Sequence, residues 1–397
     1  MKIVILPLII KDRRHWSFYR IHQPYGYIKN VLGKDIFIYD PAVHDLERLS
    51  NEIAQAAIVI CHLPVTESHH KLIRAIMSLT DKKRKIVVDI DDDLFNVPPW
   101  NPAYKRYGTK EINTQYTNKE QVADLMAVLP EEAKRLVQIN PDGSANVAMW
   151  KDKTHGFDIE TNQLNLNRLQ SIIKEVDLLT VPTSQLADKL RKYRPEGKIA
   201  VLPNLIDLNR YRPMNKKNDG KLRIVWQGGA SHYQDLVMVK LELISFAKKH
   251  PEIEYLFKGV NYPGLFHELG DRVKWVFGHP DIYAYPLSLS ELSGDIAICP
   301  LIDDDFNNGK SPLKWEEMSA MKLPCVCSPI VYGNYIEHGK TGFIAREGEW
   351  GTYLEELLDP KKREQVGQNA YDHVKKNFSI ENASLYWSTL QDLAAEL

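Results

Sequence analysis

The stretch DIAICPLIDDDFNNGKSPLKWEEMSAMKLPCVCSP, residues 295–329, decides the fold class. It begins with a short apolar run, passes through a polar loop into a helical pattern, and ends in a second apolar run. Apolar runs that are hydrophobic on both faces and are joined by helices predict neighbouring strands of a parallel sheet. The stretch therefore indicates an α/β protein.

The same alternation extends outward over most of the chain. Further apolar runs of strand length start at Lys2, Ile36, Ala56, Lys85, Asp177 and Lys198 in the first half, and at Leu222, Ile253 and Val273 in the second. Amphipathic stretches separate them. The pattern predicts two tandem units, each a parallel sheet covered by helices, and 397 residues can bury two cores.

A polar, glycine-containing stretch, NKKNDGK at 215–221, places the hinge between the units near 205–221. We expect a first domain at 1–205, a second at 206–378, and a C-terminal amphipathic helix at 379–397. Residues from about 104 to 160 break the alternation and are longer than an ordinary connection. We interpret them as a helical insertion in the first domain.

Composition excludes several classes of protein. The chain is 44% hydrophobic with net charge −1, which excludes disorder as the main state and gives no global attraction to nucleic acid. Basic runs at 11–14 and 82–85 leave a local basic face open, with solvated surface as the alternative. No apolar run approaches the roughly 20 residues of a membrane helix.

The N-terminal run is interpreted as a buried strand rather than a signal peptide. We expect a soluble, cytoplasmic protein without membrane insertion. Its four cysteines lie in apolar, strand-like runs, which favours reduced core thiols over disulfides or a zinc site: Cys61, Cys299, Cys325 and Cys327.

Candidate functional residues follow the predicted strands, because ligands of open parallel sheets bind beyond the carboxyl ends of the strands. The second unit offers a tight turn and polar groups after its first strand. The candidates are Arg20, His62, Asp91, Asp92 and Asp93 in the first unit, and Gly228, Gly229, Ser231 and His232 in the second.

The segment NGKSPLKWEE, residues 308–317, predicts an anion site. Lys310 and Ser311 precede a helix whose free N–H groups favour a phosphate, and Lys314 is spaced to face the same anion. Glu317, about one turn further on, could accept hydrogen bonds from a ribose diol. The segment is not a P-loop, because the Walker pattern needs glycine where this chain has Asp304.

Two aspartate triplets, 91–93 and 303–305, have two interpretations. Their oxygens could bind Mg²⁺ or Mn²⁺. Alternatively they cap helices, solvate loops or accept hydrogen bonds from sugar hydroxyls. For the second triplet we prefer the alternative, and for the first both stay open.

These motifs resemble the group 1 (family four) retaining glycosyltransferases of GT-B fold. PNLIDLNRYRP at 203–213 resembles their interdomain signature, and KSPLKWEEMSAMKLPCVCSP resembles their donor motif, with Glu317 at the ribose-binding glutamate. HGKTGFIA at 338–345 resembles the short, glycine-containing strand that follows the donor motif in this family. The family commonly carries a second glutamate eight positions before the ribose-binding one, where this chain has Gly309. It also carries an arginine and a lysine after the first strand of the donor domain, where this chain has the stretch GGASHYQD. The resemblance covers residues 175–397 well, and some of its motifs also resemble a bacteriophage branch.

The resemblance implies two Rossmann-like domains that face an interdomain cleft, and transfer of a sugar, with retention, from a nucleotide-diphosphate sugar, with UDP as the expected nucleotide. The donor would contact Gly228, Gly229, Ser231, Lys310, Ser311, Lys314 and Glu317. Catalytic roles would fall to Asp91, Asp92 and His232, and acceptor-side roles to Arg20, His62 and Asp93. No metal is expected to be required.

The phage resemblance suggests a hydroxymethylated pyrimidine in DNA as acceptor and the host cytoplasm as location, whereas a glycan in polysaccharide biosynthesis is the alternative. The insertion is where we expect acceptor specificity. Two other functions stay open: a sugar-nucleotide epimerase of the same architecture, and a non-catalytic nucleotide-sugar-binding protein. The sequence does not indicate an oligomeric state.

Overall fold

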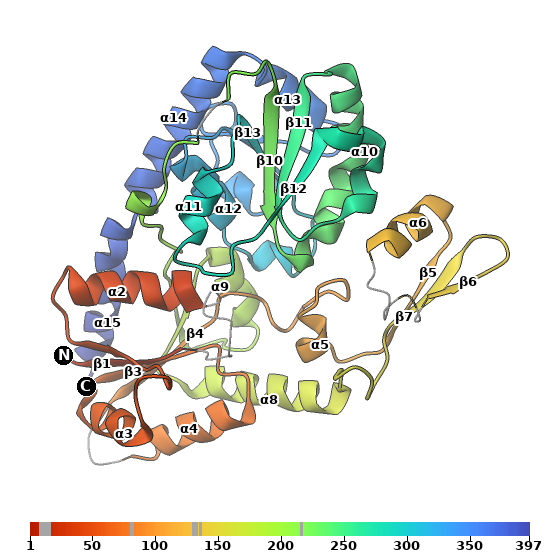
Figure 1. Cartoon of the computed structure of the whole chain (residues 1–397). Helices are drawn as coiled ribbons and strands as arrows, with labels where there is room; N and C mark the ends of the chain where they lie inside the picture. Colours follow the sequence, from red (N-terminus) through yellow and green to blue (C-terminus); the bar gives the residue numbers. More distant parts are fainter. Residues whose placement is uncertain (8–16, 80–82, 129–133, 135–136, 215–216) are drawn as a thin grey trace.

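The computed structural model describes residues 1–7, 17–79, 83–128, 134, 137–214 and 217–397. It contains two six-stranded parallel sheets, one in each half of the chain, as predicted (Figure 1). Of the predicted basic runs, Lys11, Arg13, Arg14 and Lys82 lie outside the described residues, as do residues 215–216 of the expected hinge.

The first sheet has the strand order β2-β1-β3-β4-β8-β9, and all of its pairings are parallel. Val4 packs on one face and its neighbours Ile3 and Ile5 on the other, because successive side chains of a strand alternate. The strands are β1 (Ile3–Leu6), β2 (Ile36–Ile38), β3 (Ile58–His62), β4 (Lys85–Asp89), β8 (Leu178–Val181) and β9 (Lys198–Val201).

Helices cover both faces of this sheet. One face carries α3 (Leu46–Gln55), α4 (Glu67–Met77), α8 (Ile159–Glu175) and α9 (Ser184–Arg191), and the other η1 (Phe18–His22), α2 (Gln23–Asn30), η7 (Ile380–Ala383) and α15 (Ser384–Ala394). Side-chain caps begin the four helices of the first face, because an N-cap oxygen accepts a free N–H of the first turn. The caps are Asp45, Thr66, Asp158 and Thr183.

The second sheet has the order β12-β11-β10-β13-β14-β15, again parallel throughout. The order reverses between β10 and β13, which makes the carboxyl ends of these two strands the expected ligand position. The strands are β10 (Leu222–Gly228), β11 (Ile253–Gly259), β12 (Val273–Phe277), β13 (Ile296–Cys299), β14 (Cys325–Cys327) and β15 (Phe343–Ile344).

Helices again lie on both faces of the second sheet. One face carries α10 (Tyr233–Lys249), η4 (Pro263–Arg272) and α13 (Trp350–Glu356), and the other α11 (Tyr285–Ser290) and α12 (Leu313–Ala320), against which α14 (Pro360–Asn377) packs. Short helical turns complete the unit: η2 (Leu208–Arg210), η3 (Ala230–His232), η5 (Asn307–Gly309) and η6 (Tyr332–Asn334).

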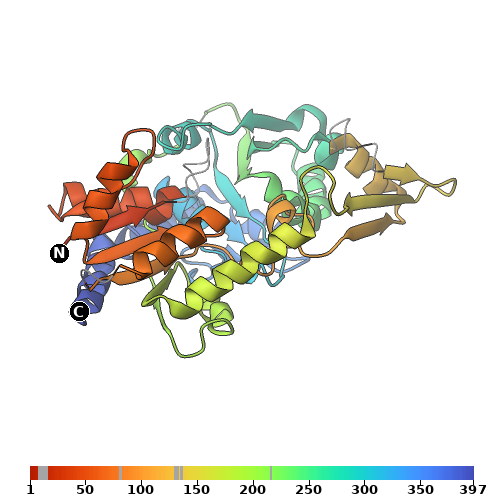
Figure 2. The ribbon, with the colours of Figure 1, turned by 90° about the horizontal axis from the view of Figure 1, so that it is seen from below.

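The chain passes between the two cores twice, at adjacent points. Leu205 packs in the first core and Ile206 in the second, and Phe378 packs in the second and Ile380 in the first. Ile206 N donates to Phe378 O at 2.8 Å, and Ile380 N donates to Ile206 O at 2.9 Å. We call 1–205 together with 379–397 the first unit, and 206–378 the second unit. The two chain ends consequently lie near each other on the first unit (Figures 1 and 2).

The prediction of a helical insertion was wrong in its secondary structure. The segment contains the helices α5 (Tyr104–Tyr107) and α6 (Lys119–Val128) and an antiparallel sheet of order β5-β7-β6, with β5 (Ile112–Tyr116), β6 (Val137–Ile139) and β7 (Ala145–Trp150). The sequence INTQY alternates between half-buried and exposed positions. A strand with one solvated face lacks the continuous apolar run by which buried parallel strands are detected.

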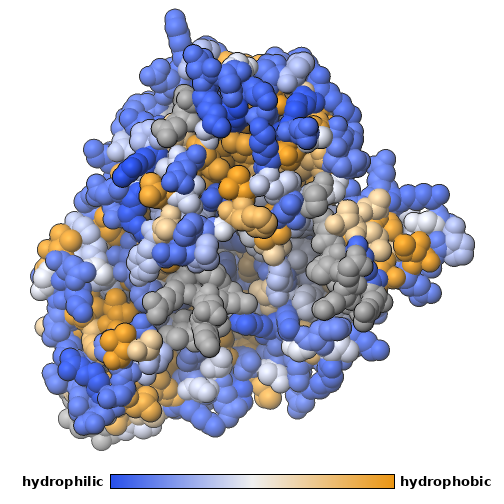
Figure 3. All heavy atoms as spheres, in the orientation of Figure 1, coloured by the Kyte–Doolittle hydropathy of each residue, from blue (hydrophilic) through white to orange (hydrophobic). Residues whose placement is uncertain are grey.

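The described residues of the range 112–150, which we call the arm, project to one side of the molecule (Figure 2). The arm also contacts the second unit, where Asp124 of α6 pairs with Lys240 of α10 at 2.7 Å. Its exposed surface includes Ile139, and apolar side chains are visible there in Figure 3. The arm is therefore a further connection between the two units, in addition to the two passages of the chain.

Candidate active site

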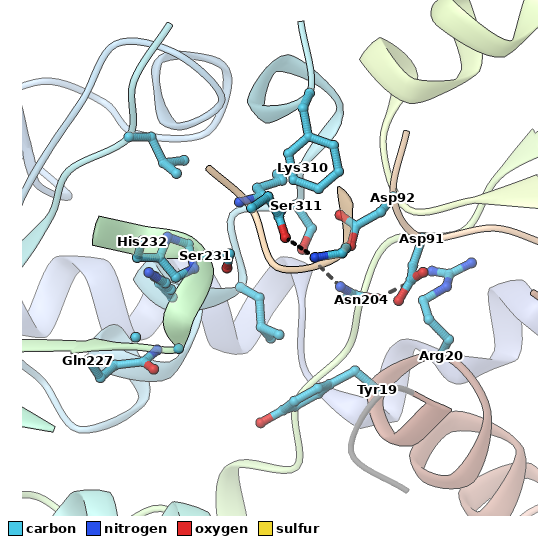
Figure 4. A pocket seen from close by; sticks show the side chains of 18 of the residues that line it. Tyr19, Arg20, Asp91, Asp92, Asn204, Gln227, Ser231, His232, Lys310 and Ser311 are labelled. Atoms are coloured by element: carbon cyan, nitrogen blue, oxygen red, sulfur yellow. Dashed lines mark hydrogen bonds between the residues drawn. The ribbon is translucent and has the colours of Figure 1, made fainter. Parts of the chain in front are cut away.

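A cavity of about 460 Å³ lies between the two units, at the carboxyl ends of the strands. Figure 4 shows side chains from both units around it. The first unit contributes the loop after β4, and the second contributes the turn after β10 and the loop between β13 and α12. Eleven of the thirteen predicted site residues line it, including all seven expected donor contacts: Arg20, Asp91, Asp92, Gly228, Gly229, Ser231, His232, Lys310, Ser311, Lys314 and Glu317.

His62 and Asp93 are the two predicted residues that do not line the cavity. The structure therefore brings most of the predicted residues together at one cavity, where their individual contacts differ.

The second unit supplies the positive charge of the cavity. Lys310 ends the η5 turn, and Lys314 lies in the first turn of α12, so that both face the same space as predicted. Lys314 is half-buried as a residue, but its Nζ is buried and has no hydrogen-bond partner among the described residues. Burial lowers the pKa of Lys314 to about 8. The Nζ lies 5.6 Å from the centre of the Trp226 ring, but a buried ammonium without a hydrogen-bond acceptor is costly, which is typical of a group that binds an anion.

His232 is held by a neighbouring carboxylate. Its Nδ1 lies 2.6 Å from Asp235 Oδ2, and Asp235 Oδ1 accepts from Ile302 N at 2.8 Å. Burial, together with the charges of Lys314 and Lys310, lowers the pKa of His232 to about 3. The imidazole is therefore neutral, with its Nδ1 proton directed to Asp235, and Nε2 is the nitrogen left for a ligand.

The turn after β10 brings backbone close to the cavity. Gly228 pairs with Gly259 of β11, which has φ +121°, and a β-carbon on Gly259 would lie 2.0 Å from the Gly228 carbonyl oxygen. A side chain cannot be placed there without moving the strands. At Gly229 a β-carbon would meet no atom within 4 Å, so that this residue borders open space where a ligand can approach the backbone.

Ser311 connects the two units. Its Oγ accepts from Asn204 Nδ2 at 2.9 Å, and Asn204 Oδ1 in turn accepts from Arg20 at 3.4 Å. Figure 4 shows Asn204 lying between the other two side chains. Thr183 also donates to the carbonyl of Gly309 at 3.1 Å. The loop before α12 is thus fixed against the first unit.

Glu317 lies at the centre of a buried polar cluster. Its Oε1 accepts from the hydroxyl groups of Tyr19, at 2.5 Å, and Tyr211, at 3.1 Å, and its Oε2 accepts from Gln227 Nε2 at 3.0 Å. Burial raises the pKa of Glu317 to about 7, although the two tyrosine hydrogen bonds oppose that rise. The carboxyl group is therefore partly ionised near neutral pH.

Asp91 and Asp92 face the cavity from the first unit (Figure 4). Burial raises the pKa of both, and the neighbouring Asp92 raises that of Asp91 further, whereas Lys310 opposes the rise at Asp92. Carboxyl groups with raised pKa values retain a proton more readily and can donate as well as accept a hydrogen bond. They suit contacts to hydroxyl groups.

Arg20 requires a correction. It lines the cavity, but its guanidinium is 1% exposed and makes a bidentate ion pair with Asp89 at the end of β4. Its remaining hydrogen bonds go to the Leu202 carbonyl, Asn204 and Tyr386. Because protein groups occupy these donors, Arg20 holds the strand ends and the crossing segment together instead of contacting an acceptor.

His62 and Asp93 do not line the cavity, contrary to the expectation. His62 ends β3 beside Asp89 in the sheet, and burial lowers its pKa to about 4. Asp93 accepts from Phe95 N at 3.2 Å and from Asn96 Nδ2 at 2.8 Å, as a turn-capping residue does. Strand-end position alone does not decide whether a side chain points into the cavity or into the core.

Among the described residues, one group of three potential metal-ligating side chains lies close together, and it consists of cysteines rather than of an aspartate triplet. The sulfur atoms of Cys299, Cys325 and Cys327 lie within 4.8 Å of one another in the second core. All four cysteines are buried and free. Asp304 accepts from Asn307 N at 2.7 Å, which agrees with the preferred capping role of the second triplet.

The sequence interpretation missed the partners of Glu317. Tyr19 belongs to no motif, and Tyr211 lies within the predicted interdomain signature without being singled out there. Gln227 stands directly before the glycine pair without any spacing that marks it. Asn204 lies within the predicted interdomain signature, but its contact to Ser311 spans 107 residues of sequence. Tyr107, the last residue of α5 in the insertion, also lines the cavity, as do Asn101 and Ala103 just before α5.

Within the described part of the chain, no helix has both the length and the apolar composition that crossing a membrane requires.

Comparison with known proteins shows the fold. No family model and no curated protein matches the sequence. Among solved structures, sucrose-phosphate synthase from Thermosynechococcus elongatus superposes with a TM-score of 0.59 at 12% identity over the full length of both chains. Anabaena HepE in complex with UDP and glucose superposes with a TM-score of 0.57 at 14% identity, over 99% of both chains. The predicted α/β fold of GT-B type is confirmed.

Proposed function

We propose that the protein is a retaining glycosyltransferase that moves a sugar from a nucleotide-diphosphate sugar, with UDP as the nucleotide, to an acceptor hydroxyl. The observation that carries the proposal is the buried Nζ of Lys314, which has no hydrogen-bond partner among the described residues and belongs to a cavity also lined by Lys310 and His232. Such a site has a strong electrostatic preference for an anion of two or more charges. The likeness to HepE, whose structure contains UDP and glucose, agrees with a diphosphate there.

The donor would lie across the second unit. Lys310, Lys314 and the backbone at Ser311 and Gly229 would carry the diphosphate, and Glu317 would accept hydrogen bonds from the ribose. The negative charge of the diphosphate increases as the bond to the sugar breaks, so that fixed cations nearby stabilise the transition state more than the ground state. His232 and Ser231 would adjoin the phosphates or the sugar.

Transfer with retention needs no separate strong base. The bond between the anomeric carbon and the phosphate oxygen breaks, a bond from the acceptor oxygen forms on the same face, and the departing phosphate oxygen takes the acceptor proton. Asp91 and Asp92, opposite the lysines, would orient the hydroxyl groups of the sugar or of the acceptor. We propose that this chemistry is independent of metal, because the two lysines supply the positive charge that a divalent cation would otherwise provide.

The test has two parts. A thermal-shift panel with UDP, GDP, ADP, dTDP and CDP, each with and without Mg²⁺ or Mn²⁺, identifies the nucleotide, since a ligand at about 100 times its Kd adds roughly 2.7 kcal/mol to the native state. Release of the nucleoside diphosphate from the matching nucleotide-sugar is then measured with candidate acceptors. A shift with one diphosphate that does not depend on metal is expected. No shift with any nucleotide would contradict the donor site.

The acceptor stays a prediction. A duplex that contains hydroxymethylated pyrimidine and a set of saccharides, assayed side by side with the same donor, distinguish the DNA acceptor from the glycan. Formation of a stereoisomer of the donor sugar without an acceptor would indicate the epimerase. Binding without turnover or donor hydrolysis would indicate the non-catalytic protein.

A further inference from the structure

The carboxylate expected to bind the ribose already holds two hydroxyl groups of the protein. The phenol oxygens of Tyr19 and Tyr211 both lie on Glu317 Oε1, at 2.5 and 3.1 Å, and are 3.2 Å from each other. Two hydroxyl donors at this spacing, directed at one carboxyl group, reproduce what the 2′- and 3′-hydroxyls of a ribose would offer. Gln227 occupies the other oxygen of the same carboxyl group.

The two tyrosines come from different parts of the chain. Tyr19 belongs to η1 of the first unit, 298 residues from Glu317, and Tyr211 follows η2 at the start of the second unit. Both Tyr19 and Glu317 line the cavity, and Tyr19 is also visible at its edge in Figure 4. The hydrogen bond from Tyr19 to Glu317 is therefore a contact between the units as well as an occupant of the expected ribose position.

We propose that Tyr19 is an internal competitor of the donor: its hydroxyl holds Glu317 in the free protein, and a ribonucleotide donor binds by displacing it. This proposal rests on the donor site described above. A ribose that replaces Tyr19 removes one contact between the two units, so that donor binding is coupled to their relative position. Tyr211, which is in the same unit as Glu317, can stay in place and share the carboxyl group.

The coupling follows from simple exclusion. Oε1 accepts two hydrogen bonds in the free protein, which is its ordinary capacity, so an incoming ribose hydroxyl must replace one of them or be confined to Oε2. The bond to Tyr19 is the shorter of the two, and its loss opposes donor binding. Removing that hydroxyl group alone should therefore strengthen binding of a ribonucleotide, which is opposite to the usual effect of a substitution in a binding site.

The test compares the wild type with Tyr19→Phe by isothermal titration calorimetry, using UDP and 2′-deoxy-UDP. For Tyr19→Phe we expect UDP to bind about tenfold more tightly, the effect of removing one competing hydrogen bond to a charged group. The gain should be smaller for 2′-deoxy-UDP, which has one hydroxyl fewer for Glu317. Tyr211→Phe gives a second measurement in the same direction, for use if Tyr19→Phe does not fold.

The matched control is Tyr255→Phe. Tyr255 is a buried tyrosine of the second core whose hydroxyl donates to the Leu243 carbonyl at 2.7 Å, remote from Glu317 in the contacts it makes. The Tyr255→Phe variant also loses one hydrogen bond from a buried phenol hydroxyl, and its UDP affinity should equal that of the wild type. UDP affinity of Tyr19→Phe that is equal to or below that of the wild type would overturn the proposal, because Tyr19 would then support the ribose site. If no protein binds UDP, the donor site itself fails, and this inference fails with it.

Discussion

Two cationic side chains, Arg20 and Lys314, line the same cavity from opposite units with their charged groups buried, and the hydrogen-bond partners of those groups differ. Arg20 of the first unit has an ion pair with Asp89 and three further hydrogen-bond partners, whereas Lys314 of the second has no hydrogen-bond partner among the described residues. Burial opposes the charge of both. For Arg20 the attraction of Asp89 outweighs burial and the pKa is raised, but for Lys314 burial prevails and the pKa is lowered.

This contrast separates a structural charge from a binding charge. A charge whose hydrogen bonds are all made within the protein stabilises the fold and has little left for a ligand. A charge that is buried without a partner reduces stability and is available to an anion. The same comparison explains why the first unit's edge, rich in carboxyl groups, and the second unit's edge, rich in cations, have different proposed roles.

The largest expected effect is on the structural charge. Arg20→Met leaves Asp89 buried without its cation and should lower the free energy of unfolding by about 3–5 kcal/mol. Chemical denaturation measures it. Lys71→Met is the control, because Lys71 makes an ion pair with Glu67 in which both side chains are exposed, and its loss should cost less than about 1 kcal/mol. Equal losses for the two variants would contradict the distinction.

The binding charge should show the opposite pattern. Lys314→Met removes a charge-assisted contact and should weaken diphosphate binding by about 1.5–3 kcal/mol, roughly tenfold to hundredfold. Its free energy of unfolding should be unchanged or higher, since an unpaired buried charge is lost. Calorimetry and denaturation are compared with Lys248→Met, an exposed lysine on α10. Undiminished affinity in Lys314→Met would show that the donor-site assignment is wrong.

The pH dependence tests the same lysine without a substitution. The pKa of Lys314 is about 8, lowered by burial, and a bound anion favours the charged form. Affinity for the diphosphate should therefore fall as pH rises above 8, by up to about tenfold per pH unit. Because the folded pKa is below the unfolded one, the free energy of unfolding should rise over the range from 8 toward 10.5. A flat affinity profile to about pH 10 would count against Lys314.

The smallest effect is expected for Asp93, which makes structural hydrogen bonds at the edge of the first unit. Asp93→Ala removes its turn contacts to Phe95 and Asn96 and should lower the free energy of unfolding by about 1 kcal/mol. Turnover at saturating substrate should stay near that of the wild type. Asp92→Asn, one residue earlier and on the cavity lining, should lower turnover without a comparable loss of stability. Lower turnover in Asp93→Ala than in Asp92→Asn would contradict the assignment of Asp92, rather than Asp93, to the cavity lining.

Features that depend on a few neighbouring residues could be predicted from the sequence, whereas contacts between distant residues could not. Buried parallel strands were recognisable because the residues that point to either face are apolar, which gives a nearly continuous apolar run such as IVICH of β3. The strand INTQY of the arm was not recognisable, because its alternate residues are exposed and three polar residues stand in a row at its centre. The turn at Gly228 and the helix that begins at Leu313 were predictable from local residue types.

The sequence by itself determined the two α/β units and the residue types at the ends of their strands, since periodicity and turn chemistry act over a few residues. Only the tertiary structure decided which charges are paired. Arg20 meets Asp89 across 69 residues, and Tyr19 meets Glu317 across 298. Hydrogen-bond partners at such separations depend on how the two sheets and the crossing segments pack, and no local pattern encodes that packing.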